Sequence, residues 1–370
     1  MKSRLKNVLI QTAGILVAAT LTYLAMRNVD FPAMWGALRQ ANYWWLIPLV
    51  AVTLVSHFLR AWRWRMFLDA LSEDQSLGNA PRVSLWLSFS SVMIGYMINN
   101  AAPRLGEFAR AANLSSQAKW RFSSVFGTVV VERVLDMVVL LVILIVVGVI
   151  IAGSAAAETV LFGPLRTRFA AVSVSDVLIA CLVLAALAAM VFLLPSMLRK
   201  HRGASRLIVR LGPVIASFRE GFLTLFRSKN RAGIFVTTVL IWTGYWLMLY
   251  LPLFMLHMRQ PYGVGAETAF VLLGIGSLGF VVPAPGGIGA YHYFVIQTFV
   301  HLYAVPYDVA AGFAVLTHAA QLVLLSTGGF VCLLAQGSSV SSMIGAARKA
   351  RSKTGEEHAP TSESEGYISS

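Results

Sequence analysis

Glu132, Arg133 and Asp136 lie inside an apolar stretch that covers residues 124–151. A charged side chain at the centre of a bilayer costs about 2.5 to 3.5 kcal/mol on insertion scales, so such residues are functional candidates by default. On a helix, Arg133 can pair with Asp136, whereas Glu132 and Asp136 share a face and repel each other. The two carboxylates therefore require a cation, a proton or a further basic group. A buried network that only fixes helix packing is the alternative.

A second polar cluster ends the apolar stretch 84–102 and continues beyond it. Its members are Asn99, Asn100, Pro103, Arg104, Gly106, Glu107 and Arg110. If a helix begins after Pro103, the two arginines share one face with Glu107, and the free N–H groups at the helix start can face an anion. Arg104 or Arg110 is then the predicted partner of the two carboxylates in the first cluster. The alternative is a solvated ion pair at the base of a hairpin.

Weaker polar signals lie near the end of the chain. His318 and Gln321 share one face of the last apolar stretch, and we expect them to line the same cavity as His292; interhelical hydrogen bonds are the alternative. The candidate hinge residues are Pro103 and Gly106 in the first half, and Pro283, Pro285, Gly286, Gly287 and Gly289 in the second. Near the second apolar stretch, Arg60, Trp62, Arg63 and Trp64 are interpreted as an interfacial anchor, with tryptophan at headgroup level and arginine towards phosphate.

Several chemistries find no support in the sequence. Gly274-x-Gly276-x-x-Gly279 matches a dinucleotide fingerprint, but it lies in an apolar segment without a preceding strand, so close helix packing is the expected explanation. The chain has no Walker A sequence, no His-Glu-x-x-His motif and no cysteine pair with metal spacing. We therefore expect neither a cofactor nor a metal ion, and we expect the protein not to be an enzyme.

The amino-acid composition indicates which kind of secondary structure positions these clusters. The 370 residues are 57% hydrophobic and only 12% charged, about half the charged fraction of soluble domains. The formal net charge of +14 does not indicate nucleic-acid binding, because no soluble domain remains to carry a basic face. We predict an all-α, multi-pass protein of the cell inner membrane. Six full spans are expected at residues 8–26, 44–62, 124–151, 174–197, 234–258 and 309–334, with broken segments at 84–102 and 269–305.

The distribution of lysine and arginine sets the orientation, because cytoplasmic loops collect these residues. The basic loop 199–231 and the pair Lys119 and Arg121 both remain cytoplasmic only if the segment 84–102 enters and returns as a re-entrant hairpin. Both termini are then cytoplasmic. A second hairpin, broken at residues 283–289, is favoured over two full spans because irregular backbone at membrane depth is tolerated around a cavity.

The resulting order gives two halves of opposite topology, about 1–153 and 172–337, within one membrane domain of residues 1–337. Inverted repeats with broken helices that meet near the midplane are typical of secondary transporters. Between the halves, the spacing of apolar residues in 203–228 predicts a cytoplasmic amphipathic helix. The tail 338–370 is rich in serine, glycine and charge, so we predict that it is disordered.

Four motifs in order resemble those of the flippase-like family, also named for the lysylphosphatidylglycerol synthase transmembrane region. They are Arg60-Ala-Trp-Arg63-Trp64, Pro103-Arg-Leu-Gly-Glu107 with Arg110, Glu132-Arg-x-x-Asp136, and Pro283-Ala-Pro-Gly-Gly-Ile-Gly289. The resemblance implies a membrane protein that translocates or handles lipids. It also implies a glutamate at the position of His292, which here is a group that titrates nearer neutral pH.

These observations lead to a hypothesis of lipid translocation. We expect Arg104, Arg110 and Arg133 to hold a phosphate-bearing headgroup, because the planar guanidinium donates two hydrogen bonds to phosphate. The cargo would be a phospholipid or a polyprenyl-phosphate-linked glycan, and the expected partners are anionic membrane lipids and a glycosyltransferase or other lipid-biosynthesis protein. The alternatives are an intramembrane enzyme that uses Glu132 and Asp136 as acid and base, and a non-transporting membrane assembly partner.

Overall fold

The computed structural model describes residues 16–73, 82–102, 105–152, 230–280 and 285–337, and within these ranges it is helical without strands. Four of the described helices are long and apolar enough to cross a membrane, as expected for a multi-pass membrane protein. The span predicted at 174–197, the amphipathic helix predicted at 203–228 and the tail 338–370 lie outside the described residues. The same holds for Pro103, Arg104 and Pro283.

Most of the described helices lie in the predicted apolar stretches. The described helices are the helix Leu16–Met26, α2 (Phe31–Arg39), α3 (Leu46–Glu73), α4 (Leu85–Ala101), α5 (Gly106–Ala118), α6 (Phe122–Ala152), α10 (Arg231–Met255), α11 (Arg259–Tyr262), α12 (Ala266–Gly279), α13 (Ala290–Tyr303) and α14 (Tyr307–Ala335). The 3-10 turn η1 (Tyr43–Trp45) lies between α2 and α3, and the 3-10 turn η3 (Pro285–Gly287) lies between α12 and α13. Local capping explains some boundaries: the Ser84 hydroxyl accepts a hydrogen bond from the Leu87 backbone at 3.1 Å and starts α4.

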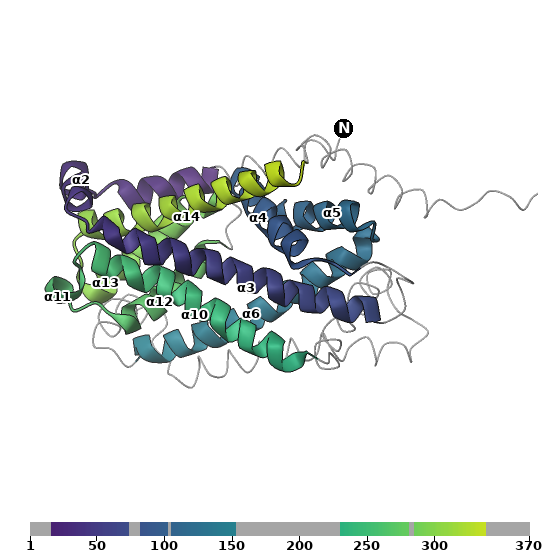
Figure 1. Ribbon diagram of the computed structural model, residues 1–370. Helices are drawn as coiled ribbons and strands as arrows, with labels where there is room; N and C mark the ends of the chain where they lie inside the picture. Colours follow the sequence, from purple (N-terminus) through teal and green to yellow (C-terminus); the bar gives the residue numbers. More distant parts are fainter. Residues whose placement is uncertain (1–15, 74–81, 103–104, 153–229, 281–284, 338–370) are drawn as a thin grey trace, which may run out of the picture.

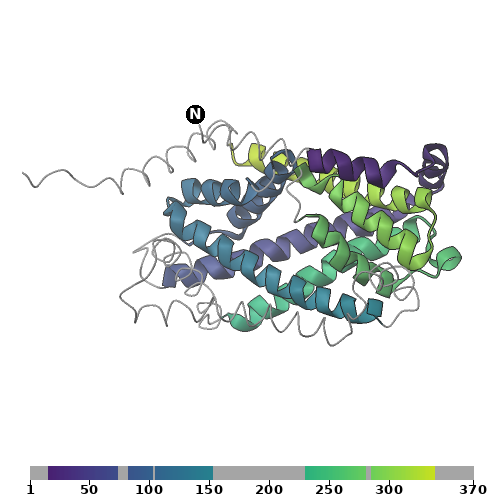
Figure 2. The same cartoon turned by 180° about the vertical axis from the view of Figure 1, so that it is seen from behind.

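The long helices α3, α6, α10 and α14 run between two ends of the molecule (Figures 1 and 2). α3 ends and α6 begins at the same end, so α4 and α5 together return the chain to the end from which it entered. α12 and α13 do the same at the opposite end, between the end of α10 and the start of α14. Each of these two returns consists of a pair of helices shorter than the four long ones.

The packing pairs join the two halves. α3 packs along α10, α4 along α14, and α12 along α6, while α5 packs on α4 and α13 on α12. The largest buried apolar cluster combines residues of α10, α12, α13 and α14 with Ile143 and Val147 of α6, and a second cluster joins α3, α4, α5 and α6 with Ile234 of α10. The cores of both halves therefore contain the helices of one return and the long helices that flank it.

Glycines allow the closest helix contacts, as expected for Gly274-x-Gly276-x-x-Gly279. A side chain at Gly274 would meet Val147 of α6 at 3.0 Å, and one at Gly279 would meet the backbone of Tyr291 at 2.7 Å. In the first half, a side chain at Gly106 would overlap the backbone carbonyl of Gly95. The prediction of close helix packing at the glycine motif is confirmed.

The second break depends on backbone conformations that glycine adopts readily. Gly286, Gly287 and Gly289 have φ angles of 58°, 77° and 86°, in the left-handed region that side-chain-bearing residues rarely enter. Gly289 immediately precedes α13, so the chain changes direction within a few residues. Three of the predicted hinge residues, Gly286, Gly287 and Gly289, therefore lie where the backbone turns.

The interpretation of residues 60–64 as an interfacial anchor is wrong for three of its four members. α3 continues to Glu73, well beyond the predicted end of the span, so Arg60 and Arg63 lie in the interior of a helix. Arg60 is 2% exposed, Arg63 and Trp64 are fully buried, and only Trp62 faces outwards. The two arginines point into the protein because they form ion pairs there with Glu132 and Asp136, as described below.

We predict that Gly279→Ala destabilises the protein, because the new methyl group would push α12 away from the backbone of α13. Overpacking of this kind costs typically about 1 to 3 kcal/mol. Thermal unfolding of the purified protein in detergent measures the effect. Gly148→Ala is the matched control, since a side chain at Gly148 meets no described residue within 4 Å; equal unfolding temperatures for the two variants would contradict the packing argument.

Candidate functional site

Glu132 is the centre of a buried ionic network. Its carboxylate lies on α6, is fully buried, and contacts three guanidinium groups. Arg60 Nε lies 2.7 Å from Oε1 and Arg110 Nη2 lies 2.8 Å from Oε2. Arg63 Nη2 is more distant, at 3.4 Å from Oε1. Arg110, one of the two partners predicted from the sequence, contacts this carboxylate, while Arg104 lies outside the described residues. α3 supplies two more arginines.

Asp136 lies one helical turn beyond Glu132 and shares the two arginines of α3. Arg60 forms an ion pair with Asp136 Oδ2, and Arg63 Nη2 donates to Oδ1 at 2.6 Å. The two guanidinium groups thus offset the repulsion between neighbouring carboxylates that the sequence predicts. The expected pair between Arg133 and Asp136 is present but long, at 4.0 Å.

Neutral side chains from α10 and α6 hold the arginines of α3 and the neighbouring tryptophan. Arg60 donates to the Tyr245 hydroxyl at 2.6 Å, and Arg63 donates to the Thr238 hydroxyl at 3.0 Å. Trp64 donates from its indole nitrogen to the Thr128 hydroxyl of α6 at 2.9 Å, and the Arg110 guanidinium lies over the Trp64 ring at 4.9 Å. The network therefore joins α3, α5, α6 and α10.

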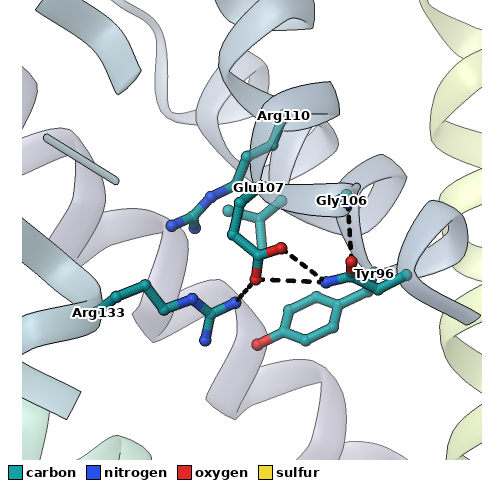
Figure 3. A pocket seen from close by; sticks show the side chains of 8 residues that line it. Tyr96, Gly106, Glu107, Arg110 and Arg133 are labelled. Atoms are coloured by element: carbon teal, nitrogen blue, oxygen red, sulfur yellow. Dashed lines mark hydrogen bonds and ion pairs between the residues drawn. The ribbon is translucent and has the colours of Figure 1, made fainter. Parts of the chain in front are cut away.

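The first return presents a second ion pair, between Glu107 of α5 and Arg133 of α6 (Figure 3). Asn99, near the end of α4, positions it: its side-chain oxygen accepts a hydrogen bond from the Gly106 backbone at 2.7 Å, and its amide nitrogen donates to Glu107 Oε2 at 3.3 Å. Asn99 thus satisfies an N–H group at the start of α5 and orients the glutamate in one step. The Arg133 side chain remains 34% exposed, in contrast to the other three arginines.

The network carries more positive than negative charge. Arg60, Arg63, Arg110 and Arg133 surround Glu107, Glu132 and Asp136. With every group ionised, these described residues have a formal charge of +1. An excess charge in a poorly solvated site favours the approach of an opposite charge. The arrangement is therefore suited to an anion, and Arg133 is the arginine most accessible to it.

A cavity of about 490 Å³ opens beside the network, within the size range of ligand-binding pockets. Arg60, Glu107, Arg133 and Asp136 line it from the first half of the chain. Arg63 and Arg110 do not, and their guanidinium groups contact other protein groups instead. The remaining walls are mostly apolar, with leucines and methionines of α6, α10, α12 and α14. Charged and apolar surfaces therefore meet in one cavity.

The second half contributes neutral polar groups to the same cavity. His318 and Gln321 of α14 line it, as do Gly286 and Gly287 of the second break. His292 does not line the cavity itself; its ring packs against that of His318, with centroids 4.9 Å apart. In the first half, Asn100 lines the cavity and donates to the Ser326 hydroxyl of α14 at 3.0 Å.

Sequence reasoning missed several residues of this site. His57, Tyr96 and Tyr245 line the cavity, and Arg60 was placed at the membrane interface. One signal was available: His57, Arg60 and Arg63 follow one another at three-residue spacing and so form a polar stripe on one face of an apolar helix. Among the residues that the structure describes, no group of three or more histidine, cysteine, aspartate or glutamate side chains could hold a metal ion.

Comparison with known proteins gives one match. The family model described as lysylphosphatidylglycerol synthase TM region matches residues 11–329 and so covers all the residues of the site. No match was found among curated proteins or among solved structures. The four sequence motifs quoted above lie within the matched range.

We predict that Glu132→Gln destabilises the protein strongly, because three buried arginines lose the carboxylate that compensates them. Breaking a buried ion pair on one side costs on the order of 3 to 5 kcal/mol. Thermal unfolding and the folded yield from the membrane measure the loss. Glu267→Gln is the control, since Glu267 is exposed in the first turn of α12 and contributes less than about 1 kcal/mol there. A Glu132→Gln protein as stable as the control would show that the network does not support the fold.

Proposed function

Because the chain belongs to the family of the lysylphosphatidylglycerol synthase TM region, a family of membrane proteins linked to lipid metabolism, we propose that it is a lipid translocase. Its cargo would be an anionic, phosphate-bearing lipid, either a phospholipid or a polyprenyl-phosphate-linked glycan. The observation that carries the proposal is the excess positive charge at the edge of a mostly apolar cavity.

The phosphate of the cargo is assigned to Arg133 and Arg60. Both line the cavity, and Arg133 has the more exposed side chain. A guanidinium donates two parallel hydrogen bonds to phosphate oxygens, and a phosphodiester would neutralise the formal charge of +1. Arg110 has a different role from the one expected, because it is buried between Glu132 and Trp64 and holds the network together.

The rest of the cavity fits the hydrophobic part of a lipid. Leucine and methionine side chains such as Leu140, Met248 and Leu273 line it beyond the charged groups. Apolar area removed from water contributes about 25 cal/mol per Å², so an acyl or prenyl chain gains from entering. A soluble phosphate would gain only the ionic contacts, which favours an amphiphilic cargo.

The architecture we propose has six full spans and two re-entrant hairpins in an inverted repeat. The helix pairing supports it: exchanging α3 with α10, α4 with α12, α5 with α13 and α6 with α14 turns each packing pair among these eight helices into a pair that is also observed. The two returns enter from opposite ends, as inverted repeats require (Figure 1). Two broken segments would then meet at the cavity and alternately open it to each leaflet.

The burial of Glu132 argues against an intramembrane enzyme. A general base must reach the proton that it removes, whereas Glu132 is fully buried and contacts three arginines. No ATPase motif is present, so an ion gradient, a substrate gradient or a partner protein would supply the energy. We place the protein in the cell inner membrane, with both termini cytoplasmic and a lipid-biosynthesis enzyme as the class of partner.

We predict that Arg133→Lys lowers lipid transport while the unfolding temperature changes little. Lysine keeps the charge and its pairing with Glu107 but replaces the two-pronged donor with a point charge. Transport of fluorescent phosphatidylglycerol in reconstituted vesicles measures activity, and thermal unfolding measures stability. Arg65→Lys is the control, because Arg65 pairs with Asp69 on the outside of α3 and does not line the cavity.

A double variant separates a cargo site from a structural ion pair. Arg133→Gln combined with Glu107→Gln removes both charges, so no carboxylate is left unpaired. If Arg133 holds phosphate, the double variant is folded and inactive. Restored transport in the double variant, against a loss in Arg133→Gln alone, would mean that the arginine serves only to neutralise Glu107, and the phosphate assignment would be abandoned.

The topology has its own test, which uses single cysteines in a chain whose Cys181 and Cys332 are replaced by serine. We predict that an impermeant thiol reagent added to intact cells labels Gln260→Cys in α11 and does not label Lys353→Cys in the tail. Both sites react after the membrane is permeabilised. Labelling of Lys353→Cys from outside would overturn the cytoplasmic placement of the C-terminus.

A further inference from the structure

The cavity has a second polar end whose hydrogen-bonding capacity is not used within the described part of the chain. His318 is 9% exposed, and its Nε2 has no hydrogen-bond partner there. The amide nitrogen of Gln321 lies 3.9 Å from the Met248 sulfur, which is a weak acceptor. Leaving a buried donor or acceptor unsatisfied costs about 1 to 3 kcal/mol. These groups therefore favour a polar ligand.

Two of the polar atoms at this end lie close to Gly286 of the second break. A Cβ atom at Gly286 would lie 3.8 Å from Asn100 Oδ1 and 3.9 Å from His318 Nε2. Gly286 has no side chain to fill that position, and Asn100 is held by its hydrogen bond to Ser326. The amide oxygen accepts a hydrogen bond, and an imidazole nitrogen can donate or accept one. A hydroxyl group, which does both, matches the two atoms.

Among the described residues, the charged groups that line the cavity come from the first half. They are Arg60, Glu107, Arg133 and Asp136, whereas the described part of the second half contributes no arginine, lysine, aspartate or glutamate to the lining. Ionic groups prefer phosphate, and neutral amides and imidazoles suit hydroxyl groups. The charged end of the cavity and its neutral polar end are thus suited to different parts of one headgroup.

Along the sequence, the neutral groups of the second half recur at the same spacing as the ionic groups of the first half. The separation of 185 residues between Arg60 and Tyr245, which bond to each other, also separates Glu107 from His292, Arg133 from His318, and Asp136 from Gln321. The first two members of each trio are in contact: Glu107 forms an ion pair with Arg133, and the ring of His292 packs at a tilt against that of His318, with an interplanar angle of 57°. The neutral trio therefore occupies the place in the second half that the ionic trio occupies in the first.

We infer that His318, Gln321 and Asn100 form a hydroxyl-binding subsite, with His292 positioning the His318 ring. The inference rests on the proposed lipid site. It narrows the class of cargo to a lipid whose phosphate carries a hydroxylated substituent, either a polyol or a sugar. Arg133 and Arg60 bind the phosphate, and the subsite binds the hydroxyl groups beyond it.

Native mass spectrometry of the purified full-length protein tests the subsite with two matched lipid pairs. The first pair is phosphatidylglycerol and phosphatidylpropanol, which have the same charge and chain and differ in hydroxyl groups. The second is a glycosyl-phosphoryl-polyprenol and a propyl-phosphoryl-polyprenol. Equimolar competition gives the preference within each pair, and the pair with the larger preference identifies a polyol or a sugar as the substituent.

We expect the unaltered protein to prefer the hydroxylated member of at least one pair by about threefold to tenfold for each hydrogen bond made. Gln321→Leu should bring that ratio close to one, and so should His318→Phe, which keeps an aromatic ring without nitrogen. Gln297→Leu is the matched control, because Gln297 contacts His301 and does not line the cavity. It should keep the ratio of the unaltered protein.

The outcomes separate the subsite from the proposed function. Binding of both members of each pair without preference would overturn the subsite and leave the phosphate site standing. A preference that persists in both Gln321→Leu and His318→Phe would also overturn it. If none of the four lipids binds, or if Arg133→Gln leaves binding of every lipid unchanged, the proposed function fails as well.

Discussion

The buried negative charge of Glu132 must be neutralised, and the rest of the structure depends on this constraint. A fully buried carboxylate is stable only when cations and hydrogen-bond donors replace the water that it has lost. Three arginines do so, and they come from α3 and α5, helices that are distant in sequence from each other. Because Tyr245 and Thr238 of α10 hold two of the arginines, the same interaction also sets the register of α10 against α3.

The arrangement of α4 and α5 is required for the neutralisation of Glu132. Arg110 reaches Glu132 only because α5 lies close to α4, and that approach requires Gly106 to contact the Gly95 carbonyl without an intervening side chain. Asn99 then closes the start of α5 and orients Glu107 towards Arg133. The positions of the glycines, the asparagine and the charged groups of this region therefore depend on one another, and Arg133 is the arginine among them whose side chain stays partly exposed.

The sequence predicts the helices and one partner of the buried carboxylates, but not the geometry of the site. Two carboxylates on one face of an apolar helix require a cation, and this reasoning predicts Arg104 or Arg110, of which Arg110 contacts Glu132. It missed Arg60 and Arg63 because Trp62 and Trp64 beside them resemble an interfacial belt and suggested that the span ends there. The three-residue spacing from His57 to Arg63 would have placed them inside a helix. Which helices lie around the cavity depends on long-range packing, which no local pattern encodes.

The two halves differ in chemistry for a physical reason. A second ionic trio opposite the first would add more desolvated charge to the same cavity, and each buried ion carries a penalty of several kcal/mol unless its partners are well placed. Histidine and glutamine at those positions keep the cavity polar without that penalty. Under the proposed inverted repeat, Glu107 corresponds to His292 and Asp136 to Gln321, and the members of each pair share only their place on the helices. The packing of the helices therefore supports the proposed repeat, whereas the side chains at corresponding positions differ in charge.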